Sequence, residues 1–137
     1  GGHFTWSPIA PKPVVMIAGG SGIAPIMSMI RHRSAIAEKA PLLLMFSVRT
    51  EADIIFATEL ESLAVNDPNF HLIIALTRSD KITSSHRPMR QFSRINRAMI
   101  ESALSNLAIP PSHTYICGGS SFVEAIRIAK FISNAQS

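Results

Sequence analysis

The stretch "VVMIAGGSGIAPIMSMI", Val14 to Ile30, joins a short apolar run to a segment of helical period through three glycines. The apolar run predicts a buried strand, and the periodic segment predicts a helix. Glycines between them allow a tight turn and a close approach of a ligand to the backbone. Because the free N–H groups and the positive dipole end of the helix face such a turn, the junction predicts an anion site, typically for a diphosphate. The alternative is a turn whose glycines serve packing alone.

Two common phosphate-binding templates fit this junction poorly. No Lys follows the glycines, which excludes G-x-x-x-x-G-K-[ST]. Pro25 occupies the last position of G-x-G-x-x-G, and no acidic residue ends the second predicted strand to hold a ribose. An ordinary dinucleotide-binding fingerprint is therefore absent.

Short apolar runs alternate with longer helical segments along the rest of the chain. The alternation is typical of βαβ units, and strands that are apolar throughout indicate a parallel sheet covered on both faces. The pattern predicts an α/β fold, a Rossmann-like doubly wound parallel sheet with helices on both faces. The predicted strands are 14–18, 42–47, 71–76 and 114–117, and the predicted helices are 24–37, 56–65, 95–107 and 121–133.

Length and composition favour one globular domain. The chain has 137 residues, a net charge of +4 and no apolar run close to the roughly 20 residues that a membrane-spanning helix needs. Its one cysteine, Cys117, has no partner in the chain for a disulfide, which favours a reducing, cytoplasmic setting. Five scattered histidines show no metal-ligand spacing, and no nucleophile-elbow sequence suggests a hydrolase.

Two segments depart from a simple layered domain. Residues 7–13, "SPIAPKP", carry three prolines and predict an extended linker after "GGHFTW". The connection from Arg78 to about Arg94 is long, polar and basic, a length that is often functional or disordered. Its segment "HRPMRQFSRINR" favours a docking face for an acidic electron-transfer protein, or plain solvation, over a nucleic-acid patch.

Five motifs together resemble one protein family. In order along the chain they are "GGHFTW", "AGGSGIAP", "SVRTEADIIFATEL", "SRIN" and "YICGGSSFVEAI". Their order and spacing are similar to those of the ferredoxin-reductase-like family, flavoprotein oxidoreductases in which a flavin-binding barrel precedes an NAD(P)-binding domain. The resemblance implies that residues 1–13 are a remnant of the flavin-domain end with its proline-rich linker, and that residues 14–137 are the NAD(P)-binding domain.

The resemblance also implies a cofactor site. Residues of the glycine junction would line the pyrophosphate and nicotinamide side of the cofactor: Gly19, Gly20, Ser21, Gly22, Ile23 and Pro25. Cys117, Gly118 and Gly119 look like the family's Cys-Gly loop beside the nicotinamide, so Cys117 is the candidate catalytic residue, placing the ring without acting as a nucleophile. Its position at the end of a predicted buried strand agrees with ligand binding at the carboxyl edge of an α/β sheet. The alternative is a small buried residue with no role in binding.

The choice of nicotinamide rests on the residues that follow the strands. In the family, a hydroxyl and an Arg after the third strand surround the 2′-phosphate, so Thr77 and Arg78 favour NADP(H) over NAD(H). Arg49 and Arg94 are further candidates, because a guanidinium brings several N–H donors and a permanent charge to a phosphate. A solvated face explains a surface arginine equally well.

Some family features are missing from the chain. It has no Arg-x-Tyr-Ser/Thr flavin motif, and it ends at "FISNAQS" without the final strand of many members. We therefore expect FAD to be held only by a partner or a missing domain, an isolated chain without reductase activity, and a flavin domain or subunit and an acidic acceptor such as a ferredoxin as partners. The expected function is transfer of hydride from nicotinamide to that flavin. The alternative is a non-catalytic nucleotide-binding or interaction module.

Overall fold

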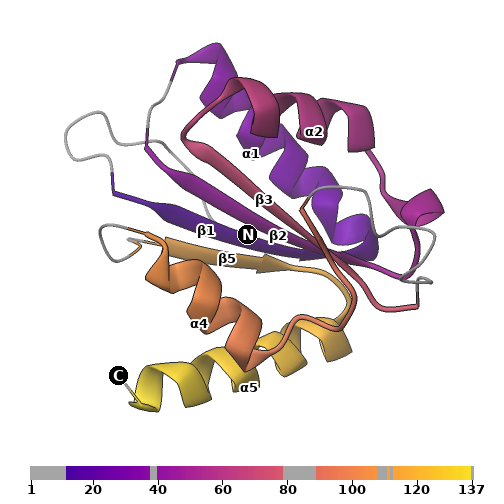
Figure 1. Cartoon of the computed structure of the whole chain (residues 1–137), viewed down its shortest axis with the longest axis vertical. Coiled ribbons are helices and arrows are strands. Elements are labelled where there is room, and N and C mark those ends of the chain that lie inside the picture. The colour runs from indigo at the N-terminus through magenta and orange to yellow at the C-terminus, as the bar shows by residue number, and fades with distance from the viewer. Residues whose placement is uncertain (1–11, 38–39, 79–88, 108–110, 112, 137) are drawn as a thin grey trace.

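The computed structural model describes residues 12–37, 40–78, 89–107, 111 and 113–136, with side chains described as far as residue 129 (Figure 1). Five strands form one sheet: β1 (Val14–Gly19), β2 (Leu42–Val48), β3 (Phe70–Leu76), β4 (Arg90–Gln91) and β5 (His113–Cys117). The α-helices are α1 (Ile23–Ala35), α2 (Ala57–Asn66), α4 (Arg97–Ser105) and α5 (Ser120–Gln136). Two short 3-10 helices, η1 (Gly20–Gly22) and η2 (Glu51–Asp53), follow β1 and β2.

The sheet is parallel, with strand order β4-β3-β2-β1-β5. Val14 of β1 is paired with Leu42 of β2 on one side and with His113 of β5 on the other. The chain thus moves outward from β1 to β4 and then returns to the opposite side of β1. In open α/β sheets, ligands bind at the carboxyl ends of the strands where the order reverses in this way.

Alternate residues of each strand enter two separate cores. The core under α1 and α2 contains Met16, Leu44 and Ile74, and the core under α4 and α5 contains Ile17, Met45 and Ala75. Figure 1 shows the two helix pairs on opposite faces of the sheet. The predicted doubly wound α/β fold is confirmed. Helices cover both faces of the sheet, so its strands are largely apolar and show no regular polar alternation.

The four predicted strands and four predicted helices are present, with ends shifted by up to three residues. The sequence prediction missed β4, which lies inside the connection predicted between Arg78 and Arg94 and is too short for an apolar run. Predictions on residues 1–11 lie outside the described residues. Across the described part of the chain, every helix is too short or too polar to cross a membrane.

Candidate functional site

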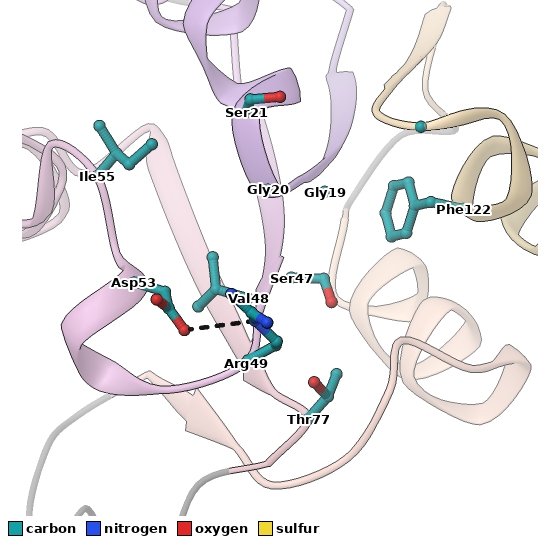
Figure 2. A pocket seen from close by; sticks show the side chains of 11 residues that line it. Gly19, Gly20, Ser21, Ser47, Val48, Arg49, Asp53, Ile55, Thr77 and Phe122 are labelled. Carbon is teal, nitrogen blue, oxygen red and sulfur yellow. Dashed lines mark ion pairs between the residues drawn. The ribbon is translucent and has the colours of Figure 1, made fainter.

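A pocket of about 390 Å³ lies at the carboxyl ends of the strands (Figure 2). Its volume falls within the range of small-molecule sites. Four consecutive positions in the sheet contribute to it: the turn after β5, the turn after β1, the end of β2 and the residue after β3. The lining residues are Gly19, Gly20, Ser21, Ser47, Val48, Arg49, Asp53, Ile55, Thr77, Gly119 and Phe122.

The glycines of the β1–α1 turn each have a structural reason. Gly20 has φ +54°, a backbone conformation that disfavours side chains with a β-carbon. A β-carbon on Gly19 would lie 2.8 Å from the Phe122 ring, and one on Gly22 would lie 2.4 Å from the Cys117 carbonyl oxygen. Packing therefore explains Gly19 and Gly22, whereas Gly20 and Ser21 are exposed toward the pocket. The turn leads into α1, whose positive dipole end suits an anion. The Ile23 N–H already donates to the Gly20 and Ser21 carbonyls, and Pro25 has no N–H.

The structure separates the other two residues predicted in this turn. Ile23 is fully buried in the core under α1, so its side chain does not line the pocket. Pro25 is exposed in the first turn of α1, where its missing N–H leaves no helical hydrogen bond unmade. Neither residue is part of the pocket lining.

Cys117 and Gly118 lie beside the pocket at the end of β5. Their shared peptide packs against Gly22, which ties the β5 end to the glycine turn. Cys117 is half-buried, and burial raises the pKa of its thiol. A protonated thiol is a poor nucleophile, which fits the predicted placing role for Cys117. Gly119, one residue further, lines the pocket and has open space where a β-carbon would lie.

Two of the four residues predicted for the 2′-phosphate line the pocket. Arg49 and Thr77 do so from the ends of β2 and β3. Arg78 is exposed directly after Thr77, and its backbone N–H donates to the Arg49 carbonyl at 2.9 Å, which holds the two strand ends together. Arg94 is also exposed but follows the edge strand β4 and does not line this pocket.

Sequence reasoning missed five lining residues: Ser47, Val48, Asp53, Ile55 and Phe122. The position of Ser47 and Val48 at the end of a parallel strand could have indicated them. Asp53 supplies the carboxylate that the end of β2 lacks, and its Oδ2 lies 3.9 Å from Arg49 Nε. Figure 2 shows Asp53 and Phe122 on opposite sides of the pocket, with Arg49 between them in this view.

An ion-pair network around the buried Arg90 reaches the pocket through Glu51, which lies in the turn between Arg49 and Asp53. The Arg90 guanidinium donates to Glu51 at 2.5 and 3.0 Å and to Glu61 at 2.7 Å. Burial acts to lower the pKa of Arg90, but the hydrogen bonds to the two carboxylates outweigh it and raise this pKa. Because the Arg90 side chain is only 1% exposed, it is unavailable to the docking face predicted for this basic segment.

The lining groups fit a dinucleotide phosphate. The positive end of the α1 dipole and the Ser21 hydroxyl suit a diphosphate, the Arg49 guanidinium suits a further phosphate, and the Asp53 carboxylate can accept from ribose hydroxyls. Among the described residues, no three His, Cys, Asp or Glu side chains gather as a metal ion would require.

Comparison with known proteins identifies a matching family and relatives that are oxidoreductases. Residues 16–127 match a family described as the oxidoreductase NAD-binding domain. Ferredoxin–NADP reductase B of Sorangium cellulosum is 32% identical over 126 residues, which cover 92% of this chain and 51% of that protein. The glycine betaine monooxygenase reductase subunit of Chromohalobacter salexigens is 32% identical over 129 residues, covering 92% of this chain and 33% of that protein. The chain thus spans about half or less of the length of these relatives.

Solved structures share the fold. A ferredoxin NADP+ reductase from Neisseria gonorrhoeae, with bound FAD and NADP, has a TM-score of 0.68 at 24% identity, covering 88% of this chain and 48% of that one. The cytochrome b5 reductase domain of Ulva prolifera nitrate reductase has a TM-score of 0.69 at 24% identity, covering 90% of this chain and 44% of that one. The parallel sheet, the pocket at its switch point and the match over residues 16–127 agree, and the chain belongs to the oxidoreductase NAD-binding domain family.

Proposed function

We propose that the chain is the NADP(H)-binding part of a flavin-dependent electron-transfer reductase. The observation that carries this proposal is the single pocket that joins the glycine turn after β1 to Arg49 and Thr77. The sheet order places β5, β1, β2 and β3 side by side, a span of roughly 14 Å at ~4.8 Å between strands. A dinucleotide along this edge has its nicotinamide at β5, its diphosphate at β1 and its adenosine at β2 and β3.

Each end of the pocket has a distinct task. The turn after β1 holds the diphosphate through backbone N–H groups and Ser21. Thr77, Arg78 and Arg49 surround the 2′-phosphate, because charge-assisted hydrogen bonds from a guanidinium are stronger than neutral ones. At the other end, Cys117 and Gly118 place the nicotinamide without offering a competing acid or base. When bound, the reduced nicotinamide supplies hydride, for which a flavin is the acceptor.

The flavin and the final electron acceptor come from other domains or subunits in this proposal. Relatives of the chain are named as reductase components, for example of a propane 2-monooxygenase and of a naphthalene dioxygenase system with a ferredoxin. An FAD module and an acidic acceptor such as a ferredoxin are therefore the proposed partners. We expect the 137-residue chain alone to bind nucleotide and to lack reductase activity.

The test uses Gly119, which lines the pocket directly before α5. Its carbonyl accepts from Val123 N–H at 3.0 Å, so it occupies the N-cap position, where Asp and Asn are both favourable. Gly119→Asp places a carboxylate at the nicotinamide end of the pocket, which the β1 turn proposed to hold the diphosphate also lines. Gly119→Asn is the matched uncharged control. The measurement is a titration of each chain with NADPH.

We expect Gly119→Asp to weaken NADPH binding at least tenfold more than Gly119→Asn does, with both variants as stable as the parent. Charge repulsion accounts for that difference, because the two side chains have nearly the same shape. Equal affinities for the two variants would place the diphosphate elsewhere. Failure of the parent chain to bind NADPH would refute the proposed function itself.

A further inference from the structure

Arg90 does not line the pocket, but it hydrogen-bonds to a segment of chain that forms one wall of the pocket. That wall is the β2–α2 turn, residues 49–55, which contributes Arg49, Asp53 and Ile55 to the lining. Glu51, in the middle of the turn, accepts two hydrogen bonds from Arg90. Since Glu51 is two residues from Arg49 and two from Asp53, the position of Glu51 influences the backbone positions of both residues.

The turn is held in two different ways. Its internal shape is fixed by Asp53, whose Oδ2 accepts from the Thr50 backbone N–H at 3.1 Å and from the Thr50 hydroxyl at 3.0 Å. These contacts lie within the turn and cannot fix it relative to the sheet. The bond from Arg78 N–H to the Arg49 carbonyl anchors the start of the turn to the end of β3, and Ile54 near its other end is buried in the core. The Arg90–Glu51 pair anchors the middle of the turn, because Arg90 belongs to β4, whose neighbour in the sheet is β3.

Arg90 is itself rigidly placed. Ile74 N–H donates to the Met89 carbonyl at 2.8 Å, and Met89 has φ 64°, a left-handed conformation that is unfavourable for a non-glycine residue. Such strain persists where the surroundings determine the conformation, and here it directly precedes the buried guanidinium. Strain of this kind is often found beside functional sites.

The same network offers an internal comparison. Glu51 and Glu61 accept from one guanidinium and are equally exposed, at 31% and 30%. Glu51 belongs to the pocket wall, whereas Glu61 belongs to α2 and lines no part of this pocket. Removal of either carboxylate leaves the buried guanidinium paired with the other one, so neither variant creates an unpaired buried charge.

We propose that Arg90 is a positioning residue for the adenosine end of the nucleotide, acting through Glu51 on the turn that carries Arg49 and Asp53. This inference rests on the proposed function, since it needs the adenosine to lie at β2 and β3. Arg90 touches no ligand. Its effect comes from holding Arg49 and Asp53 in place, because hydrogen bonds to a ligand weaken steeply when donor and acceptor move out of range.

The experiment compares Glu51→Met with Glu61→Met and Arg90→Lys in the 137-residue chain. The probes are NADPH and 2′,5′-ADP, which carries only the adenosine end with its 2′-phosphate. We expect Glu51→Met and Arg90→Lys to raise the Kd for both probes by about tenfold or more, and Glu61→Met to change it by less than about twofold. Thermal unfolding shows whether Glu51→Met and Glu61→Met lower Tm equally, which separates positioning from general destabilisation.

A second control is Arg33→Lys. Arg33 is as buried as Arg90 and pairs with Asp67, which lies after α2, away from the carboxyl ends of the strands. We expect it to lower Tm and leave both Kd values unchanged. Equal effects of Glu51→Met and Glu61→Met on Kd, or none from either, would overturn the positioning role while leaving the proposed function intact. A parent chain that binds neither probe would overturn both.

Discussion

Gly22 packs directly against the carbonyl of Cys117, so closely that a β-carbon on Gly22 would lie 2.4 Å from that oxygen. The two residues are 95 positions apart in sequence and belong to the turn after β1 and the end of β5. Their contact joins the two turns on either side of the point where the strand order reverses, between β1 and β5. It also places the predicted nicotinamide end of the pocket next to the predicted diphosphate end.

The first prediction concerns Gly22→Ala. The clashing atoms belong to the Cys117–Gly118 backbone, which cannot rotate away as a side chain could, so we expect a loss of about 2–3 kcal/mol in the free energy of unfolding. Tm should fall by roughly 6–10 °C. Gly119→Ser is the control, because a β-carbon there meets open space and Ser suits an N-cap. Equal thermal stability of the two variants would contradict the contact.

The second prediction concerns the pair formed by the buried Arg33 and the partly exposed Asp67, whose charged groups lie 2.6 Å apart. Asp67→Asn removes a charge-assisted partner of a guanidinium that is 2% exposed, and we expect a loss of about 2–3 kcal/mol at pH 7 by urea unfolding. Glu59→Gln, in the exposed pair with Arg31, is the control and should change stability little.

The same pair predicts a pH dependence. Burial acts to raise the pKa of Asp67, but the hydrogen bond from Arg33 and further interactions outweigh it, so its pKa in the folded chain lies below the ordinary value. The unfolded chain therefore binds more protons, and the stabilisation is present above about pH 4 and is lost as the pH falls through the folded pKa. Unfolding at pH 7 and pH 3 should show a smaller acid loss for Asp67→Asn. If the stability lost between pH 7 and pH 3 is the same in Asp67→Asn as in the parent, that loss comes from other carboxylates.

The sequence was sufficient to predict β1, β2, β3 and β5 because strands of a covered parallel sheet are largely apolar. The run of β1 and the glycines after it predict both a strand and its turn, and the strand ends place Arg49 and Thr77 at one edge. Those two residues and the glycine turn therefore meet as expected. The local sequence pattern was therefore enough to place a site residue wherever that residue directly follows a strand.

Long-range contacts account for what the sequence could not predict. Arg90 lies in a basic segment that looks solvated, yet its partners are 39 and 29 residues away. Phe122 is one apolar residue among several in α5, and its place in the pocket depends on the absence of side chains on Gly19 and Gly118. Ile23 directly follows the glycines, which suggested a contact with the ligand. It is the first residue of α1, and its side chain is buried in the core.

The third prediction concerns the reactivity of Cys117. Burial raises the pKa of its thiol, so little thiolate is present at neutral pH. We expect alkylation by iodoacetamide at pH 7.5 to be slower in the folded chain than in urea, and its rate to rise at a higher pH in the folded chain than in urea. Cys117→Ser should leave NADPH binding within about threefold. Rapid alkylation of the folded chain at pH 7.5 would contradict the placing role and indicate an activated cysteine.

The last prediction tests the preference for NADP(H) through Arg78 and its matched control Arg94. Both arginines are exposed, but Arg78 follows Thr77 at the pocket and Arg94 follows the edge strand. A lost hydrogen bond to a charged group costs about 1.5–3 kcal/mol, so Arg78→Ala should weaken NADPH binding by about one to two orders of magnitude. NADH lacks the 2′-phosphate, and its affinity should barely change. Arg94→Ala should leave both affinities unchanged, which excludes a general effect of one lost positive charge.

Equal losses of NADPH and NADH affinity in Arg78→Ala would reject recognition of the 2′-phosphate by this side chain. Losses in both arginine variants would indicate long-range attraction of the anionic cofactor, which added salt would screen.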